Sequence, residues 1–245
     1  MIEDALIIMP AFNEGAVIQE TLAEAKKFAA TIIVIDDGSS DDTAQKAKGA
    51  GAIVLSHSAN LGYGAALKTG FTFVLRYCKE PFIMTFDADG QHDPAYLEAL
   101  LDPLRKGEAD YGIGSRFLSG ETSGTPAARK IGSKVFSIAT SILTRQKITD
   151  PTSGMLALTR NVAKIFASKF FPLDFPDADV LIMLSRMGYS LKEVPVRMRP
   201  ARRAGSMHAG IFKPAYYILK MSVSMFHFAL RRDLKEQRRE MESVL

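Results

Sequence analysis

Short apolar runs alternate with amphipathic segments through the first half of the chain. Five of these runs have the composition of buried strands and cover residues 5–10, 31–36, 52–56, 81–87 and 109–116. The segments between them have helical spacing, at about 14–29, 42–48, 62–77 and 94–106. Asp93 is typical of an N-cap before the last of these, with Pro94 at its first position. Continuous apolar strands separated by helices predict an α/β fold, with a mainly parallel sheet covered by helices on both faces.

The second half is less regular. Residues 117–127 are rich in Gly, Ser and Thr, which predicts a mobile surface loop able to serve as a lid. A helix over 128–143, a turn at 150–154 leading into a strand, and a helix over 178–187 follow. Pro195 places a last strand, 190–198, at a sheet edge. We expect one domain over 1–208 and a separate helical segment over 209–245.

Polar clusters follow each of the first four predicted strands. They read PAFNE, DDGSSDDT, SANLGYGAA and DADGQHD in chain order. One such cluster could be ordinary turn chemistry. Four on the same edge of a parallel sheet indicate a site, because ligands of such sheets bind at the carboxyl ends of the strands.

The stretch TFDADGQHDP allows three interpretations: a turn with a helix cap, a calcium loop, or a divalent-metal site. A calcium loop is excluded because His92 stands at the sixth position, where a glycine is required. Asp87 and Asp89 are two residues apart in an extended segment and project to one side. Mg²⁺ and Mn²⁺ prefer carboxylate oxygens completed by substrate phosphates, so the metal site is favoured over the turn.

The tips of the first two strands carry residues suited to a nucleotide. Asp36 and Asp37 can accept hydrogen bonds from a base or a ribose, while Ser40 or Asp41 caps the next helix. On the first strand, the ring of Phe12 can flank a base and Glu14 can bind a ribose. The glycines of NLGYGAALKTG lack the G-x-G-x-x-G spacing and follow the third strand, which disfavours a nicotinamide enzyme.

In this order, the motifs MPAFNE, DDGSSDDT, NLGYGAA, DADGQHDP, GSR and DPTSG resemble the inverting family 2 glycosyltransferases with the GT-A fold. The closest resemblance is to the branch that uses dolichyl and polyprenyl phosphates, and it covers about residues 5–208. It implies a nucleotide-diphosphate sugar donor and a Mg²⁺ or Mn²⁺ ion held by Asp87, Asp89 and Gln91. The expected donor contacts are Pro10, Phe12, Glu14, Asp36, Asp37, Gly64, Asp87, Ala88 and Asp89. Phe12 stands where the family commonly has tyrosine.

The resemblance also gives the basic residues a role. Between Pro195 and Arg232 the chain has eight Lys and Arg residues and no Asp or Glu. A solvated basic face is the plainer explanation, but Arg binds phosphate bidentately and no acid neutralises this stretch. The residues expected to bind the acceptor phosphate are Arg116, Arg129, Arg202, Arg203 and Ser206. The family ending Arg-x-x-Gly-Glu-Ser-Lys is altered here to RRAGSMH, with Met207 and His208 where the lysine would fall.

The expected mechanism is direct displacement at the anomeric carbon. Asp89, through the metal, and Arg116 would neutralise charge on the leaving diphosphate. A lipid phosphate is already anionic at neutral pH and needs no general base. A sugar hydroxyl acceptor would need one, and Asp150, Asp177 and Asp179 are the candidates. Two further classes compatible with parts of the pattern are a sugar-nucleotide nucleotidyltransferase and a catalytically idle membrane adaptor.

The last segment indicates a partner surface. Lys213, Lys220 and His227 recur every seven residues on one helical face, and the other faces are almost wholly apolar. Such a helix suits the membrane interface, docking on its own domain, or pairing with a second subunit or a membrane protein. No run of 18 apolar residues and no signal peptide is apparent, and the one cysteine suits a reducing compartment. We expect a cytoplasmic protein at the cytoplasmic face of a membrane, with no nucleic acid partner.

Overall fold

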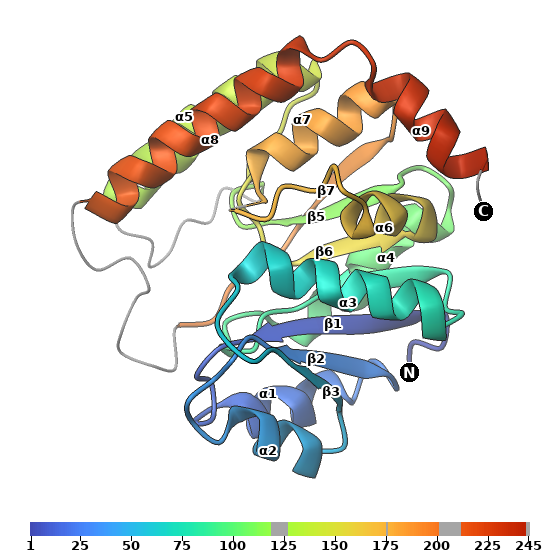
Figure 1. Cartoon of the computed structure of the whole chain (residues 1–245), viewed down its shortest axis with the longest axis vertical. Helices are drawn as coiled ribbons and strands as arrows, with labels where there is room; N and C mark the ends of the chain where they lie inside the picture. Colours follow the sequence, from blue (N-terminus) through green and yellow to red (C-terminus); the bar gives the residue numbers. More distant parts are fainter. Residues whose placement is uncertain (119–126, 175, 201–211, 244–245) are drawn as a thin grey trace.

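The computed structural model describes residues 1–118, 127–174, 176–200 and 212–243. Within them a seven-stranded sheet has the order β3-β2-β1-β4-β6-β5-β7 (Figure 1). Six strands run in one direction, and β6 is antiparallel to both of its neighbours. The strands are β1 (Ala5–Ala11), β2 (Ile32–Asp36), β3 (Ile53–Ser56), β4 (Phe82–Thr85), β5 (Tyr111–Ser115), β6 (Leu156–Thr159) and β7 (Leu191–Pro195).

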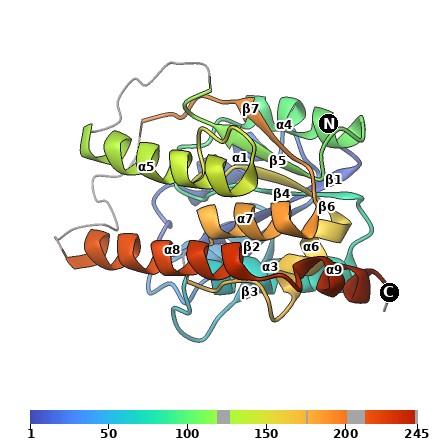
Figure 2. The same ribbon diagram turned by 90° about the horizontal axis from the view of Figure 1, so that it is seen from above.

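Helices cover both faces of the sheet, which confirms the predicted α/β class. On one face lie α1 (Ile18–Ala25) and α4 (Leu97–Arg105), and on the other lie α3 (Tyr63–Tyr77), α6 (Arg160–Ala167) and α7 (Ala178–Met187) (Figure 2). The remaining helices are α2 (Thr43–Gly49), α5 (Ala127–Thr144), α8 (Phe212–Leu230) and α9 (Leu234–Ser243), with a 3₁₀ turn η1 (Pro94–Tyr96) before α4.

The alternation of strand residues explains the two apolar cores. Leu6 and Ile8 of β1 point into the core beneath α3, α6 and α7. Ile7 and Met9 point into the core beneath α1 and α4. Successive side chains of a strand face opposite sides, so a strand covered on both faces is apolar throughout. Burying each such side chain stabilises the fold by about 1.5–3 kcal/mol.

Several expected elements differ in detail. The first helix begins at Ile18 and not near residue 14, because Gly15 and its neighbours form a turn. α6 follows β6 directly and has no counterpart among the predicted elements. The edge position of β7 is confirmed. Most of the expected lid at 117–127, and the expected domain boundary at 208, lie outside the described residues.

The C-terminal segment packs into the same core as the sheet. Met221, Met225 and Phe228 of α8, and Leu234 of α9, belong to the cluster that contains Leu6. Pro214 is the third residue of α8, in the first turn, where a proline is tolerated. In the part of the chain that the structure describes, no helix is long and apolar enough to cross a membrane.

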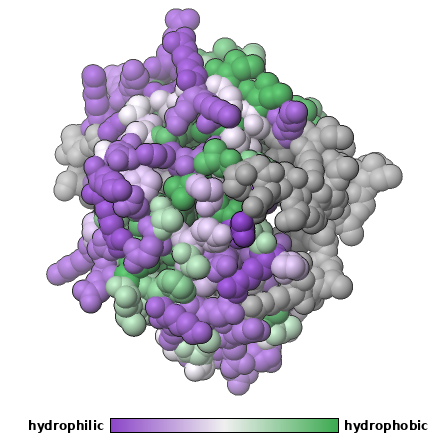
Figure 3. Space-filling model, turned by 180° about the vertical axis from the view of Figure 1, so that it is seen from behind, coloured by the Kyte–Doolittle hydropathy of each residue, from purple (hydrophilic) through white to green (hydrophobic). Residues whose placement is uncertain are grey.

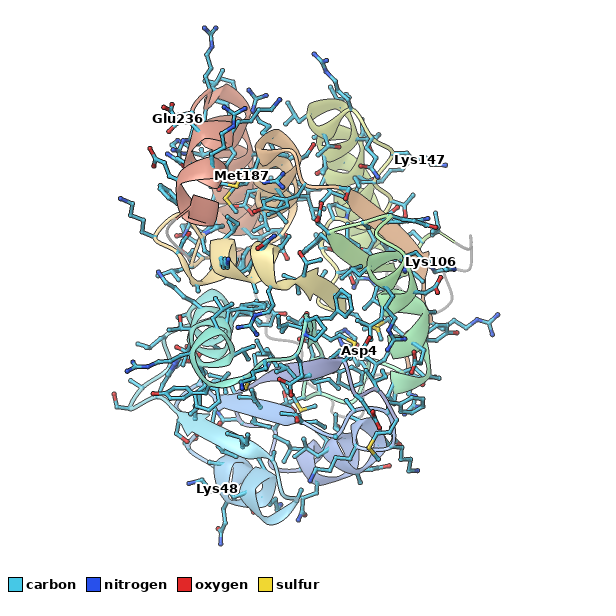
Figure 4. The ribbon with its side chains drawn as sticks, turned by 90° about the vertical axis from the view of Figure 1, so that its right-hand side faces the viewer. Asp4, Lys48, Lys106, Lys147, Met187 and Glu236 are labelled. Atoms are coloured by element: carbon cyan, nitrogen blue, oxygen red, sulfur yellow. The ribbon has the colours of Figure 1, made fainter. Side chains whose placement is uncertain are left out.

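The two edges of the sheet differ in character. The amino-terminal edge, seen face-on in Figure 4, carries Asp4 just before β1 and Lys106 just after α4. Arg105 pairs there with Asp4 through Nη2, at 2.5 Å from Oδ1. The polar clusters predicted to form a site follow the opposite ends of the strands.

Candidate active site

Asp87 lies two residues beyond β4, and two neighbours fix its carboxylate. Its Oδ1 accepts a hydrogen bond from Tyr63 Oη over 3.3 Å. Its Oδ2 lies 3.5 Å from Nε2 of the buried His92. Nδ1 of this imidazole accepts from the backbone N–H of Asp87 over 3.1 Å, so Nε2 carries the ring proton and faces the carboxylate. The side chain of Asp87 keeps 30% exposure, which leaves it accessible to a ligand.

Gly154, in the turn before β6, lies against the same carboxylate. A Cβ at this position would come within 2.6 Å of Asp87 Oδ2. The turn is fastened to β4, because Thr85 Oγ1 donates to the Gly154 carbonyl over 2.6 Å. A side chain at this position would therefore push the carboxylate of Asp87 out of place.

The electrostatics of this loop suit a divalent cation. Burial raises the pKa of Asp87; His92 opposes the shift and the charge of Asp89 adds to it. Gln91 donates to both carboxylate oxygens of Asp89, from its backbone N over 2.9 Å and from Nε2 over 2.5 Å. Burial and the charge of Asp89 both make the ionised form of Asp87 unfavourable. A cation bound by the two carboxylates would offset this cost. In the described chain no cluster of three His, Cys, Asp or Glu residues could hold a metal, so other oxygen atoms would complete the shell.

Arg116, just beyond β5, is held by a buried carboxylate. Its Nε and Nη2 each donate over 2.7 Å to Asp150, which is fully buried. Nη2 also donates to Oγ1 of Thr152 over 2.9 Å. The backbone N–H of Asp150 donates in turn to Glu193 of β7 over 2.7 Å. Asp150 thus stands behind the guanidinium, and the charges of Asp150, Asp177 and Asp87 raise the pKa of Arg116 against the effect of its burial.

A second pair of carboxylates opens α7. Asp177 is half-buried, and burial raises its pKa to about 6, which Arg116 opposes. Asp179 is fully buried, and its Oδ1 accepts from the backbone N–H groups of Asp177 and Val180. The charges of Asp87 and Asp177 both raise the pKa of Tyr63, after the larger effect of its burial. Tyr63 and Arg116 are therefore each near enough to both Asp87 and Asp177 to respond to their charges.

The carboxylate of Asp37 makes its polar contacts with the loop that follows β3. Its Oδ1 accepts from the backbone N–H of Leu61 over 2.9 Å and lies 2.7 Å from Nδ1 of His57. Its Oδ2 accepts from the N–H of Gly62 over 2.8 Å. These contacts set the loop that leads into Tyr63. The carboxylate of Asp36 accepts a hydrogen bond from the N–H of Ser39 over 3.3 Å.

The other expected donor residues take different positions. Pro10 is buried within β1 beside Ile35, while Phe12 is exposed and Glu14 half-buried on the following turn. Gly64 is buried, and a Cβ there would meet the Leu173 carbonyl at 2.2 Å, so close packing explains this glycine. Ala88, between Asp87 and Asp89 in the sequence, is buried.

The polar loops are joined to one another. Asn13, with φ of +56°, accepts from the backbone N–H of Ser40 through Oδ1 over 2.8 Å. The backbone N–H of Glu14 donates to Thr43 Oγ1 over 2.8 Å. Together with the bond from Tyr63 to Asp87, these contacts connect the loops after β1, β2, β3 and β4 in one region. Of the expected acceptor residues, only Arg116 is described; Arg202, Arg203, Ser206 and the side chain of Arg129 lie outside the described residues.

Some site residues are not evident from the sequence. Tyr63 lies within the NLGYGAA motif, but nothing in the motif indicates its contact with Asp87, and His92 stands out only as a misfit in a calcium loop. Glu193 gives no signal, because it lies within an edge strand far from the motifs. Tyr217, which donates a hydrogen bond to Asp177, lies in the C-terminal segment, where the seven-residue repeat draws attention to Lys213, Lys220 and His227 instead.

Comparison with known proteins agrees with these motifs. Residues 6–166 match the profile of "Glycosyl transferase family 2". An uncharacterised protein of Methanocaldococcus jannaschii is 36% identical over 80% of this chain and 81% of its own. The polyprenol monophosphomannose synthase of Mycolicibacterium smegmatis is 31% identical, over 78% of this chain and 76% of its own. The UDP-N-acetylglucosamine–dolichyl-phosphate N-acetylglucosaminyltransferase of Methanococcus voltae is 26% identical, over 78% and 84%.

A solved structure has the same fold. Glucosyl-3-phosphoglycerate synthase from Mycobacterium tuberculosis, in complex with Mn²⁺, UDP and glucosyl-3-phosphoglycerate, superposes with a TM-score of 0.68. The two proteins are 18% identical, and the match covers 92% of this chain and 79% of the other. The likeness confirms the GT-A fold expected from the sequence.

Proposed function

Because the chain belongs to glycosyl transferase family 2, we propose that it transfers a sugar from a nucleotide-diphosphate sugar to a polyprenyl phosphate, with inversion at the anomeric carbon. Its activity as a glycosyltransferase follows from the family. Two relatives named for dolichyl phosphate and polyprenol support the lipid acceptor. The observation that carries the proposal is the position of Asp87, Asp89 and Arg116 just after β4 and β5, at the carboxyl edge of the sheet, where the charges of Asp89 and Arg116 both act on Asp87.

The donor diphosphate would be bound at this edge. Asp87, Asp89 and Gln91 are the residues that would hold Mg²⁺ or Mn²⁺, which when bound neutralises diphosphate charge and acts as a Lewis acid. The guanidinium of Arg116 is positioned by Asp150 and stabilises the negative charge that grows on the leaving group. Asp150 acts here as a positioning residue, because its carboxylate is fully buried behind Arg116. Phe12, Glu14 and Asp36 are proposed to contact the nucleotide.

The acceptor supplies its own nucleophile. A phosphate monoester has a second pKa near 6, so an acceptor oxygen is anionic at neutral pH. That oxygen attacks the anomeric carbon from the face opposite the diphosphate, and the bond to the diphosphate oxygen breaks. No proton has to be removed in this step. Arg129, Arg202, Arg203 and Ser206 are proposed to bind the acceptor phosphate together with Arg116.

A lipid acceptor calls for contact with a membrane, and two neighbouring helices are suited to it. α5 and α8 run alongside each other in two views (Figures 1 and 2), and Phe136 of one meets Tyr217 of the other edge-on at 5.8 Å. Neither helix contains an Asp or Glu. We call their exposed apolar residues the α5–α8 surface; they are Val135, Ile138, Ile142, Ile218, Leu219, Val223, Phe226 and Leu230.

This surface combines apolar side chains with basic charge. Seen from behind, apolar side chains gather toward the upper right of the described surface, along the course of α5 (Figure 3). Lys134 lies on α5 and Arg232 just after α8; Lys220 of α8 and Arg231 are paired with Asp174 and Asp233 beside the surface. An apolar helical face with basic residues and no acids fits the interface of an anionic bilayer. We propose peripheral binding at the cytoplasmic face, which also suits a chain with one cysteine.

A second acceptor class is favoured by one observation. A pKa of about 6 would let Asp177 act as a general base for a sugar hydroxyl. The two acceptors differ in their response to Asp177→Asn. With a phosphate acceptor, the variant still transfers, with kcat lowered by about tenfold because a charge that acts on Arg116 is lost, and its rate still rises near pH 6, since that ionisation belongs to the substrate. With a hydroxyl acceptor, transfer falls by about 100-fold or more and the rise near pH 6 disappears.

The proposed function is tested by donor binding and transfer together. A thermal-shift panel of nucleotide sugars with and without Mn²⁺ identifies the donor, and a short polyprenyl phosphate then serves as acceptor. We expect one nucleotide sugar to stabilise the protein only in the presence of the metal, and its sugar to appear on the lipid phosphate. Absence of stabilisation by any nucleotide sugar would contradict the proposal.

A further inference from the structure

Two side chains of α8 reach the carboxylates that open α7. Tyr217 Oη donates to Oδ2 of Asp177 over 2.7 Å, and Ser224 Oγ donates to Oδ2 of Asp179 over 2.5 Å. Tyr217 and Ser224 are seven residues apart, two helical turns, so they lie on one face of α8. We infer that α8 is a working part of the active site, in which Tyr217 is a positioning residue that holds Asp177 toward the substrate. This inference rests on the proposed function, because the site concerned is the transferase site.

α8 fixes Asp177 by two independent routes. The direct route is the hydrogen bond from Tyr217 to its carboxylate. The indirect route runs from Ser224 to Asp179, whose other oxygen accepts from the backbone N–H of Asp177 over 3.1 Å. The same oxygen accepts from the N–H of Val180 over 2.8 Å, which ties Asp179 to the first turn of α7. Both the side chain and the backbone of Asp177 therefore depend on α8.

Asp177 is the carboxylate of this group that a substrate can reach. Asp150 and Asp179 are fully buried, whereas Asp177 is half-buried. Arg116 lies near enough for its charge to lower the pKa of Asp177, and Asp177 raises the pKa of Tyr63. The groups that interact with Asp177 come from several elements: Tyr63 from α3, Tyr111 from β5, Arg116 after β5, Asp150 before β6, Asp179 from α7 and Tyr217 from α8. A shift of Asp177 would displace a charge in contact with the substrate-binding region.

The packing of α8 allows the role of the Tyr217 hydroxyl to be tested separately from the role of its ring. The ring of Tyr217 meets Phe136 of α5, and Met221, Met225 and Phe228 are buried in the core. A phenylalanine at 217 keeps these apolar contacts and removes only the hydrogen bond. Tyr216, its neighbour on the exposed side of α8, offers the same chemical change away from Asp177. Ser222, which is exposed and bonds the Ile218 carbonyl within α8, is the matching control for Ser224.

The test compares Y217F and S224A with Y216F and S222A in steady-state transfer. We expect Y217F to lower kcat by about tenfold or more, as for loss of a hydrogen bond to a charged group, with the donor KM changed by less than about twofold. S224A should lower kcat in the same direction by a smaller factor. Y216F and S222A should match the parent. A Y217F enzyme with the kcat of Y216F would overturn the inference while leaving the proposed transfer reaction intact.

A second measurement needs no activity, so it stays decisive if the proposed reaction is wrong. Urea unfolding of Y217F, D177A and the double variant forms a cycle for the two side chains. We expect the double variant to lose less free energy of unfolding than the two single variants lose in sum. Each single change already removes the hydrogen bond between Tyr217 and Asp177, and the double variant cannot lose it twice. Additive changes would show that the two groups do not interact, and would overturn the inference whatever the reaction is.

Discussion

Arg116 and Asp150 form a bidentate ion pair, with Nε to Oδ2 and Nη2 to Oδ1 distances of 2.7 Å each. The carboxylate is fully buried, whereas the side chain of Arg116 keeps 26% exposure and its charge acts on Asp87. The sequence motifs GSR and DPTSG, 34 residues apart, thus form one unit that holds a positive charge at the carboxyl edge of the sheet. Arg116 is therefore held in place before any ligand binds, as its proposed contact with a phosphate requires.

Asp150→Asn should loosen this unit. It removes the charge that balances Arg116, and breaking a buried ion pair from one side costs about 2–4 kcal/mol. We expect this loss in urea unfolding, together with a fall in kcat of about tenfold or more. Asp42→Asn is the control, because Asp42 forms an exposed pair with Lys46 that is worth about 0.5 kcal/mol or less. Equal effects of the two changes would contradict the assigned role.

Gly154→Ala should disturb the proposed metal site at Asp87 without replacing any polar side chain. The added Cβ would lie 2.6 Å from Asp87 Oδ2, so the carboxylate has to move. We expect the affinity for Mn²⁺, measured by electron paramagnetic resonance or calorimetry, to fall by about tenfold. Gly49→Ala is the control, since a Cβ there meets nothing within 4 Å. An unchanged Mn²⁺ affinity in the Gly154 variant would show that Asp87 does not bind the metal.

Asp177→Asn should change the pH dependence of stability. The folded pKa of Asp177 is raised from 3.8 to about 6, so the native state binds more protons between those values. Ionisation of Asp177 therefore weakens the fold as pH rises through this window, and the full cost remains above pH 6. We expect the variant to be more stable than the parent at pH 7.5 by about 1–2 kcal/mol, and the difference to shrink toward pH 4. A difference that does not vary with pH would contradict the raised pKa.

The α5–α8 surface should bind anionic vesicles. Replacing Ile142 and Phe226 by serine removes two exposed apolar side chains, one from each helix. We expect the affinity for phosphatidylglycerol vesicles, measured by cosedimentation, to fall by about 100-fold or more, since two side chains that each contribute about 1.5–3 kcal/mol when buried are lost. Ile53→Ser, on the edge strand β3, removes an exposed apolar side chain outside this surface and should bind like the parent. If vesicle binding is unaffected and the double variant alters the oligomeric state, the surface contacts a second copy.

The sequence predicted the sheet well because strands covered on both faces are apolar at every position, as in β1. The same property hid the direction of β6, since a doubly covered strand has no polar face to orient it. α6 was missed because Arg160 follows β6 with no turn residue between them. Short motifs predict Asp87, Asp89 and Arg116 as site residues, whereas Tyr217 reaches Asp177 from 40 residues away and only tertiary packing brings the two together.

The most direct test of the account is donor binding by Asp89→Ala. The thermal shift produced by the preferred nucleotide sugar is measured with and without Mn²⁺, for the parent and for this variant. We predict that the parent gains stability only with metal and sugar nucleotide together, and that the variant loses this gain while its unliganded melting temperature changes little. A variant that keeps the full metal-dependent shift would contradict the assignment of the carboxylates after β4 to the metal that holds the donor.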